Sequence, residues 1–326
     1  MPVIAGDTDL ALALAAQRLA AGELVAFPTE TVYGLGARAD DAAAVARIFE
    51  AKGRPADHPL IVHVAQADAV GEFALEPSAA AQHLMAAFWP GPLTLILARR
   101  PDRARAAAGG QGSIGLRMPA HPLARALLQA AARLGVPGVA APSANRFGRI
   151  SPTTADHVVQ EFGAGLLVLD GGACAVGIES AIVDCTRAQP ALLRPGQLSR
   201  AQIEAVLGQT LAAPDAASPR ASGTLVSHYA PRAALRLWPA AALAQRLREP
   251  AAPAGGVAVY SRLVPTAALG WAHWPMPDDA AAVAHELFSV LREMDAAGVN
   301  TIWVESPPPD ALWDGVRDRL DRAAAA

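Results

Sequence analysis

The sequence predicts an α/β protein built from two domains. The chain holds 326 residues, and single domains usually hold about 100–200 residues. Apolar residues make up 52% of the chain and charged residues 17%, a balance that favours well-filled cores over disorder. Short apolar runs alternate with segments of helical periodicity along most of the chain, which is the pattern of an α/β fold.

A first domain is predicted at residues 1–208. Its helices are expected where apolar residues recur three and four positions apart, as Val45, Ile48 and Phe49 do. They span residues 10–21, 41–51, 77–88, 122–134, 151–162 and 199–207. Its strands are expected where short runs are apolar throughout or alternate strictly. They span residues 24–27, 60–64, 93–98, 113–118, 136–141, 166–170, 178–184 and 191–194.

A linker is predicted at residues 209–233, and a second, smaller domain at residues 234–326. The linker is rich in Ala, Ser, Pro and Gly and has little periodicity. It ends on Ser-His-Tyr-Ala-Pro at residues 227–231, a stretch too specific for a passive tether. The second domain alternates strand and helix and is therefore expected to be α/β. Its strands are predicted at 235–238, 257–260 and 301–305, and its helices at 241–248, 279–297 and 310–322.

Charge and cysteine content argue against several classes of protein. The net charge is −3, so no global basic field draws the chain to nucleic acid or to a membrane surface. The cysteines, Cys174 and Cys185, form no CxxC pair, which argues against a zinc site or a disulfide framework, and both are expected to be structural. No apolar run approaches the ~20 residues of a membrane span, and the N-terminus lacks the basic region of a signal peptide. We therefore expect a cytoplasmic protein without a membrane partner.

The loop after the first predicted strand is the strongest candidate for a ligand site. Residues 27–36 read Phe-Pro-Thr-Glu-Thr-Val-Tyr-Gly-Leu-Gly, with three hydroxyls and one carboxylate, Glu30. Gly34 and Gly36 allow either a positive φ or a close approach of the backbone to a ligand. Loops that follow strands are where α/β proteins place ligands. An ordinary polar loop is the alternative interpretation.

The single lysine is the second candidate. Lysine and arginine together number 27, and Lys52 is the one lysine among them. A lysine retained in so arginine-rich a chain is expected where a planar guanidinium will not serve, such as beside a phosphate. Lys52 and Arg54 follow the predicted helix at 41–51, so two cations stand at its exit. Chance retention on the surface is the alternative.

Further polar side chains lie at predicted strand ends and in loops. In the alternating run at residues 113–118, Ser113 and Arg117 share one face, with the small Gly115 between them. Four polar positions are cations, and four cations meeting in one cavity require an anion such as a polyphosphate. No Walker-type, dinucleotide, nucleophile-elbow or metal-binding spacing accompanies them. The full set is Thr31, Tyr33, Lys52, Arg54, His63, Ser113, Arg117, Ser143, Asn145, Ser180 and Arg194.

Several of these stretches together resemble the YrdC-type threonylcarbamoyl-AMP synthase family over residues 8–208. Lys52, Arg54, Ser143 and Asn145 match the signature quartet of that family. The His-Tyr-Ala-Pro stretch at 228–231 and the extra α/β domain resemble its long, two-domain form. The usual linker carries Pro-Gly-Met and basic residues, whereas this chain has Ser-Gly-Thr-Leu-Val-Ser at 222–227. The stretches that match are residues 27–36, 52–55, 59–63, 89–94, 117–119, 141–145 and 193–196.

The resemblance implies a fold and a reaction. The fold is a twisted mixed sheet with helices around a large cavity, followed by a Rossmann-like C-terminal domain. The reaction joins L-threonine, bicarbonate (or CO₂) and ATP into L-threonylcarbamoyl-adenylate and pyrophosphate, with Mg²⁺ accompanying ATP. A downstream threonylcarbamoyl transferase uses the product to modify adenosine 37 of tRNAs that read ANN codons. This chemistry depends on positioning and charge neutralisation, and strong direct RNA binding is not expected.

The resemblance also implies a role for each candidate residue. Lys52, Arg54 and Arg117 are the expected catalytic residues, and Arg117 pairs with the carboxylate of threonine. His228 and Tyr229 are expected to cover the nucleotide as a lid. The residues expected to bind ATP are Lys52, Arg54, His58, Ser113, Asn145, Ser151, Thr153, Arg194, His228 and Tyr229. The residues expected around threonine are Thr31, Tyr33, His63, Arg117, Ser143 and Ser180.

Other interpretations remain open at this stage. His63 could be a satisfied core histidine, Arg117 and Arg194 could be surface arginines, and Ser180 could bond locally. An RNA-binding module is a rival function, but it would need a basic face bearing aromatic residues. A carbamoyl-adenylate-forming maturation enzyme that shares this domain is a second rival, but it would need additional zinc-binding cysteines.

Overall fold

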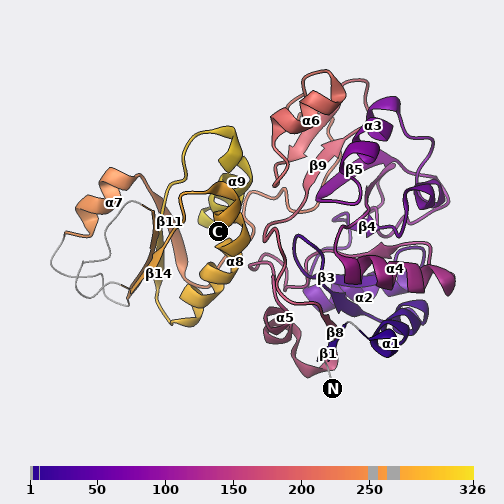
Figure 1. The fold of residues 1–326 in the computed structure, drawn as a ribbon, viewed down its shortest axis with the longest axis horizontal. Helices are drawn as coiled ribbons and strands as arrows, with labels where there is room; N and C mark the ends of the chain where they lie inside the picture. The colour runs from indigo at the N-terminus through magenta and orange to yellow at the C-terminus, as the bar shows by residue number, and fades with distance from the viewer. Residues whose placement is uncertain (1–2, 7, 249–255, 263–271) are drawn as a thin grey trace. The chain divides into compact units, whose positions relative to one another are not determined.

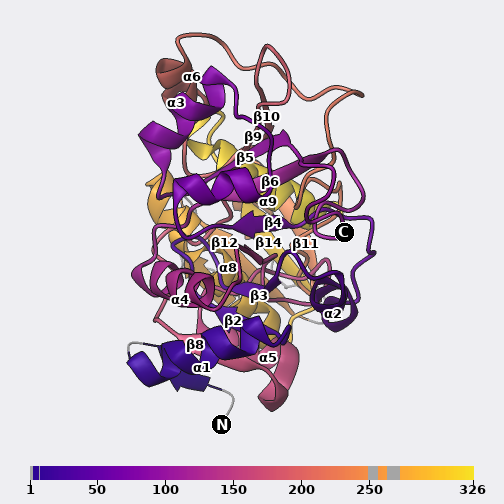
Figure 2. The ribbon, with the colours of Figure 1, turned by 90° about the vertical axis from the view of Figure 1, so that its right-hand side faces the viewer.

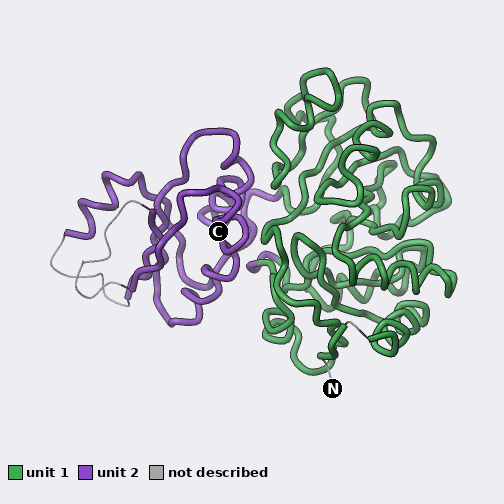
Figure 3. The backbone as a smooth tube through the Cα atoms, in the orientation of Figure 1, with its two compact units in different colours: residues 1–147, 151–224 green, residues 148–150, 225–326 purple. Residues whose placement is uncertain are grey.

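The computed structural model describes residues 3–6, 8–248, 256–262 and 272–326 (Figure 1). The chain divides into two compact units (Figure 3). The first comprises residues 1–147 and 151–224, and the second comprises residues 148–150 and 225–326. The predicted linker is thus shared between the units, which separate after Thr224. No helix in the described ranges is long and apolar enough to cross a bilayer.

Within the described residues, the first unit forms a ten-stranded mixed sheet in the order β1-β8-β2-β3-β7-β4-β6-β5-β9-β10. In Figure 2 the strands from β8 to β10 follow one another from the bottom of the view to the top. The strands are β1 (Val3–Ala5), β2 (Val25–Phe27), β3 (Gly34–Arg38), β4 (Ile61–His63), β5 (Leu93–Ala98), β6 (Ser113–Arg117), β7 (Val139–Ala140), β8 (Leu167–Asp170), β9 (Ala181–Asp184) and β10 (Ala191–Arg194). The mixed sheet confirms the fold class predicted from the resemblance.

Helices lie on both faces of this sheet. Apolar residues of α1 and α4 form one core with Val25 and Phe27, and those of α2, α3, α5 and α6 form the other core with Ala26. Polar residues cap several of these helices; Asp41, for example, accepts bonds from two backbone amides at the start of α2. The helices are α1 (Asp9–Ala20), α2 (Ala42–Lys52), α3 (Ala79–Phe88), α4 (Pro122–Arg133), α5 (Ala155–Phe162) and α6 (Arg200–Leu207), with short 3₁₀ turns at η1 (Ala67–Glu72) and η2 (Gly163–Gly165).

Strand β3 begins inside the stretch predicted as a loop. It pairs with β2 in antiparallel register, with Phe27 opposite Gly34. A Cβ atom on Gly36 would lie 2.8 Å from Phe27 Cε1 and 2.9 Å from Val139 Cγ1. The close approach predicted for Gly36 is therefore to these two side chains rather than to a ligand. The polar loop between the two strands therefore spans residues 28–33 and is shorter than predicted.

The second unit is a small α/β domain with a parallel sheet, as predicted. In its described residues the strand order is β11-β14-β12-β13, and all neighbours are parallel. Helices α8 and α9 lie on one face of the sheet and α7 on the other (Figure 1). Strand β13 was not predicted from the sequence. The elements are β11 (Ala234–Trp238), α7 (Ala240–Arg246), β12 (Val257–Ser261), β13 (Ala272–Pro275), α8 (Ala280–Ala296), β14 (Thr301–Glu305), the 3₁₀ turn η3 (Ala311–Trp313) and α9 (Asp314–Ala324).

Candidate active site

Strands β4 and β6 place the first candidate residues side by side. They pair in parallel, with His63 opposite Arg117 and Ile61 opposite Gly115. Ile114 and Leu116 point into the core shared with α2 and α3, so Arg117 lies on the opposite face of β6. This confirms the face assignment predicted from the alternation at residues 113–118.

Arg117 is buried and held on three sides. Its Nη1 donates to Thr31 Oγ1 at 2.8 Å, its Nε donates to the Gly91 carbonyl at 3.2 Å, and its Nη2 lies 2.6 Å from Glu30 Oε1. The alternative of a surface arginine is therefore wrong. Burial alone would raise the pKa of Glu30, but the charge and hydrogen bond of Arg117 outweigh burial and hold that pKa below its usual range. Glu30 stays an anion that fixes the guanidinium.

Glu30 is a site residue that the sequence-based assignment left out. Its Oε2 also accepts a hydrogen bond from the Ala120 amide at 3.0 Å. The available signal was its position as the one carboxylate among the hydroxyls of residues 28–33. The partner of that carboxylate, Arg117, comes from a strand far along the chain, so spacing along the sequence could not pair the two.

His63 lies beside Arg117 and is 3% exposed. Its Nδ1 has no hydrogen-bond partner among the described residues, while hydrogen bonds between the ring and the backbone of Ile61 and Val139 act to raise its pKa. The edge of its ring meets Phe27, with ring centroids 6.3 Å apart. Burial, and then the charge of Arg117, lowers the pKa of His63 to about 3. The imidazole is therefore neutral at physiological pH.

This low pKa predicts a loss of stability in mild acid. In the unfolded chain His63 takes up a proton near its ordinary pKa of about 6.5, whereas the folded chain excludes that proton until about pH 3. Its contribution to stability is therefore complete above about pH 6.5 and is lost as the pH falls towards 3. Between about pH 7.5 and about pH 5, we expect wild type to lose about 2 kcal/mol more free energy of unfolding than His63→Gln.

Urea denaturation at the two pH values measures this difference. His83→Gln, which alters an exposed histidine of α3, is the control and should follow wild type. Equal pH dependence of wild type and His63→Gln would contradict the buried, neutral assignment.

Lys52 ends helix α2 and is 3% exposed. Gly53 follows in the left-handed conformation and closes the helix. The Lys52 ammonium donates to the Ser143 carbonyl at 2.6 Å and to the Asn145 carbonyl at short range. Burial and the nearby charge of Arg54 lower the pKa of Lys52 well below its usual value. The structure thus brings Lys52 together with the loop that carries Ser143 and Asn145.

Arg54 and Arg194 meet at one residue of the predicted linker. Arg54 Nη2 donates to Ser222 Oγ at 3.4 Å, and Arg194 Nη1 donates to the Ser222 carbonyl at 2.8 Å. Arg194 also donates to the Ser180 carbonyl from Nε and Nη2, at 3.1 and 2.9 Å. At 2% exposure Arg194 is no surface arginine. Ser222 is therefore the shared partner of two cations that lie 168 and 28 residues before it in the chain.

The linker residues around Ser222 fill the space above β6. Ala221 packs against a small apolar patch that contains Ile61, Ile96 and Ile182. Arg220 forms an ion pair with Asp57 at 2.7 Å. The cavity left between this segment and the sheet holds only about 10 Å³, and Ser113 and Ser222 are among the residues that line it. The atypical linker therefore packs against the rest of the first unit through residues 220–222.

The remaining predicted residues of the first unit contact neighbouring side chains of the same unit. Ser180 Oγ lies 2.8 Å from Thr94 Oγ1, and Ser151 Oγ donates to Glu179 Oε1 at 2.5 Å. Thr153 Oγ1 lies 3.4 Å from His157 Nδ1. The ring of His58 meets the edge of Phe147, over which Arg54 also lies. Glu179 was not among the predicted residues, although its charge acts on Lys52.

Tyr33 lies in the main core of the first unit rather than against open space. Its hydroxyl donates to the Gly172 carbonyl at 2.8 Å and accepts from the Gly171 amide at 3.2 Å. Burial raises the pKa of Tyr33, so the phenol stays protonated. The hydroxyl anchors the chain after β8. Its predicted role beside threonine stays a prediction.

His228 and Tyr229 belong to the second unit. The ring of Tyr229 stacks on Phe288 of α8 at 5.4 Å, and the guanidinium of Arg319 lies 5.5 Å from its centroid. His228 meets the Tyr229 ring edge-on at 4.1 Å. These contacts anchor the motif on α8 and α9. The predicted role of the pair as a lid over the nucleotide stays a prediction.

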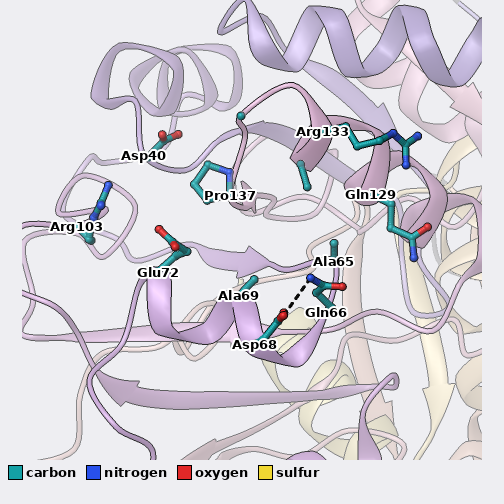
Figure 4. Close-up of a pocket in the computed structure, with 12 residues that line it drawn as sticks. Asp40, Ala65, Gln66, Asp68, Ala69, Glu72, Arg103, Gln129, Arg133 and Pro137 are labelled. Atoms are coloured by element: carbon teal, nitrogen blue, oxygen red, sulfur yellow. Dashed lines mark hydrogen bonds between the residues drawn. The ribbon is translucent and has the colours of Figure 1, made fainter.

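An open pocket of about 770 Å³ lies elsewhere in the first unit (Figure 4). Its lining mixes charges of both signs, from Asp40, Asp68, Glu72, Arg103 and Arg133. None of the predicted site residues lines it. Size alone therefore does not identify the active site. Among the described residues, no group of three or more His, Cys, Asp or Glu side chains could hold a metal ion, and Cys174 and Cys185 are buried and free.

Comparison with known proteins gives consistent results along the whole chain. The Sua5–YciO–YrdC family model, described as "Telomere recombination", matches residues 17–196. The model described as "Threonylcarbamoyl-AMP synthase, C-terminal domain" matches residues 198–325. The threonylcarbamoyl-AMP synthase of Pyrococcus abyssi is 38% identical over 320 residues, which cover 95% of this chain and 93% of that protein. The threonylcarbamoyl-AMP synthase of Bacillus subtilis is 37% identical over 327 residues, with 97% and 93% covered.

Solved structures agree with these sequence matches. The crystal structure of P. abyssi Sua5 complexed with L-threonine superposes with a TM-score of 0.85 at 37% identity. The match covers 96% of this chain and 94% of that one. The structure of a variant of the same protein, in which a histidine and the tyrosine after it are replaced by alanine, gives a TM-score of 0.86 at 37% identity, with 96% and 92% covered.

Proposed function

The chain belongs to the Sua5–YciO–YrdC family, and on this basis we propose that it is a threonylcarbamoyl-AMP synthase. It joins L-threonine, bicarbonate or CO₂, and ATP into L-threonylcarbamoyl-adenylate and releases pyrophosphate. The observation that carries the proposal is the convergence of Arg54 and Arg194 on Ser222, close to Lys52.

The ATP site is proposed at this convergence. Two guanidinium groups that meet at a neutral serine are stabilised further by an anion, because charge-assisted bonds to phosphate are stronger than bonds to a hydroxyl or carbonyl. The triphosphate therefore replaces Ser222 as the shared partner of Arg54 and Arg194. The Ser143 and Asn145 carbonyls hold the Lys52 side chain in place, and the negative charge of bound phosphates favours its protonated form. Displacement of Ala221 from the apolar patch makes room for the nucleotide.

The threonine site is proposed around Arg117. A guanidinium has five N–H donors. Gly91, Thr31 and Glu30 engage three of them, which leaves two for the carboxylate of threonine. The Nδ1 atom of the neutral His63 forms one hydrogen bond with the same ligand, as donor or as acceptor according to the tautomer. Glu30 holds the guanidinium plane while threonine enters and leaves.

The chemistry then needs little covalent work by the protein. The amine of threonine attacks bicarbonate or CO₂ and becomes a carbamate. A carbamate oxygen attacks the α-phosphate of ATP, the bond to the β-phosphate breaks, and pyrophosphate leaves. Negative charge accumulates on the phosphate oxygens during the transfer, and Lys52, Arg54 and Arg194 neutralise it. Fixing the carbamate at Arg117 makes the attack effectively intramolecular.

Mg²⁺ is proposed to enter with ATP. Magnesium keeps several waters and binds phosphate oxygens in such sites, so its ligands come from the triphosphate and water. When bound, it would add positive charge to the triphosphate and ease the departure of pyrophosphate. Lys52, Arg54 and Arg194 would supply the remaining positive charge from the protein.

The product is an activated threonylcarbamoyl group, so a transferase must consume it. We propose that this transferase places the group on N6 of adenosine 37 in tRNA, in the cytoplasm, where ATP, threonine and tRNA are available. No direct contact between this chain and tRNA is required, because the adenylate itself is passed on.

A product assay tests the proposal. The full chain is incubated with Mg²⁺, ATP, radiolabelled bicarbonate and L-threonine, and pyrophosphate and an acid-labile labelled adenylate are measured. Both products are expected, and both should disappear when threonine is omitted. Pyrophosphate release that does not depend on threonine would contradict the proposal.

A further inference from the structure

Residues 148–150, which follow Ser143 and Asn145 in the chain, form part of the second unit. Residues 143–147 and Ser151 belong to the first unit, but residues 148–150 between them belong to the second (Figure 3). The loop therefore leaves one unit and returns to it within a few residues. Such a crossing requires specific contacts at the inserted segment.

Each of the three inserted residues has a partner in the second unit. The Gly148 carbonyl accepts from the Ala230 amide at 2.8 Å, and Arg149 forms a parallel bridge with Ala230. Arg149 Nη2 donates to Asp295 Oδ2 at 3.1 Å. The Ile150 carbonyl accepts a short bond from Arg292 Nη2. Two backbone groups and one side chain thus fix the segment on α8 and on the chain at residue 230.

Asp295 links this segment to the end of the predicted linker. Its Oδ1 accepts from the Arg232 amide at 2.6 Å and from the Ala233 amide at 2.9 Å. Its other oxygen holds Arg149. The Asp295 side chain is 11% exposed and that of Arg149 is 29% exposed, so the pair is partly shielded from water. Partly shielded, charge-assisted bonds are worth more than surface ion pairs.

Along the chain, the inserted segment is flanked on both sides by residues of the proposed ATP site. Upstream, the Ser143 and Asn145 carbonyls accept from Lys52, and the Phe147 amide donates to the Lys52 carbonyl at 2.9 Å. Downstream, Ser151 Oγ donates to Glu179. Moving residues 148–150 would therefore shift both the acceptors that aim Lys52 and the Ser151 hydroxyl, because few bonds separate them along the backbone.

We propose that Asp295 is a positioning residue for ATP binding, acting through Arg149. The inference rests on the proposed function and gives the second domain a role in it. Asp295 fixes residues 148–150 and the chain at residues 232–233 relative to one another, so that the Lys52 acceptors are in place before ATP arrives. Loss of this link weakens ATP binding more than it slows the chemical step.

The test measures kcat and KM for ATP in the full chain. Arg149→Ala removes the guanidinium that binds Asp295. Asp295→Asn keeps an oxygen that can accept from the Arg232 and Ala233 amides but loses the charge that binds Arg149. Each variant is expected to raise KM for ATP about tenfold, with kcat changed less than about threefold. The double variant should be no worse than either single variant, because both remove the same link.

Glu293→Gln is the matched control. Glu293 lies on the same helix two positions before Asp295 and contacts Trp274 instead, so its KM should stay within about twofold of wild type. An unchanged KM in Arg149→Ala would overturn the inference, even if the melting temperature fell, and so would additive effects in the double variant. If Asp295→Asn does not fold, Arg149→Ala alone decides. A wild-type chain that makes no adenylate would instead refute the proposed function.

Discussion

Replacing Lys52 with alanine is expected to lower kcat/KM for ATP by at least about 100-fold while the chain stays folded. The Lys52 ammonium is buried and held by two carbonyls, so it is aimed before substrate binds. A preorganised charge at the phosphates stabilises the transition state, and alanine removes it completely. Steady-state kinetics of pyrophosphate release measures the effect, and circular dichroism confirms folding.

Two further variants sharpen this prediction. Lys52→Arg should not restore activity, because a planar fork cannot place one compact charge between the Ser143 and Asn145 carbonyls. Arg47→Ala is the control, since Arg47 lies on the same helix but donates to the Gly22 carbonyl at 2.7 Å. Its kinetics should match wild type. Turnover by Lys52→Ala at the wild-type rate would remove the phosphate role from this residue.

Replacing Arg117 with alanine is expected to lower the free energy of unfolding by about 3–5 kcal/mol. The loss arises because Glu30 then remains buried without its partner. Glu30→Gln/Arg117→Ala should be clearly more stable than Arg117→Ala alone, since a neutral amide replaces the stranded charge. Urea denaturation at neutral pH measures both variants.

The same two variants separate stability from function. Threonine-dependent product formation should be lost in both, because neither has the guanidinium that binds the carboxylate. Arg38→Ala is the stability control; its pair with Asp40 is partly exposed, and its removal should change the free energy of unfolding by less than about 1 kcal/mol. Full threonine-dependent activity in the stabilised double variant would show that Arg117 serves the fold alone.

Local patterns predicted the parts of the fold that depend on near neighbours. The alternation at residues 113–118 places Ile114 and Leu116 in the core and Arg117 on the other face, as observed. Strand β3 was not predicted because its glycines have low strand propensity. At Gly36 a glycine is needed because Phe27 and Val139 pack against it. That requirement comes from the tertiary structure and is not visible in the local sequence.

The candidate site shows the same division. Residue type and resemblance marked Lys52, Arg54, Arg117 and Arg194, and the structure places Arg54 and Arg194 on one residue. The partners Glu30 and Ser222 were missed because each is defined by a residue far away in the chain. The role of residues 148–150 was missed for the same reason, since a short Gly-Arg-Ile segment has no distinctive pattern of its own.

A crystal structure with a non-hydrolysable ATP analogue and L-threonine tests the account most directly. We expect phosphate oxygens on Arg54 and Arg194, with Ser222 displaced from both, and the carboxylate of threonine on Arg117. A nucleotide bound in the open pocket lined by Asp40, Arg103 and Arg133, with Ser222 still bonded to both arginines, would contradict the account.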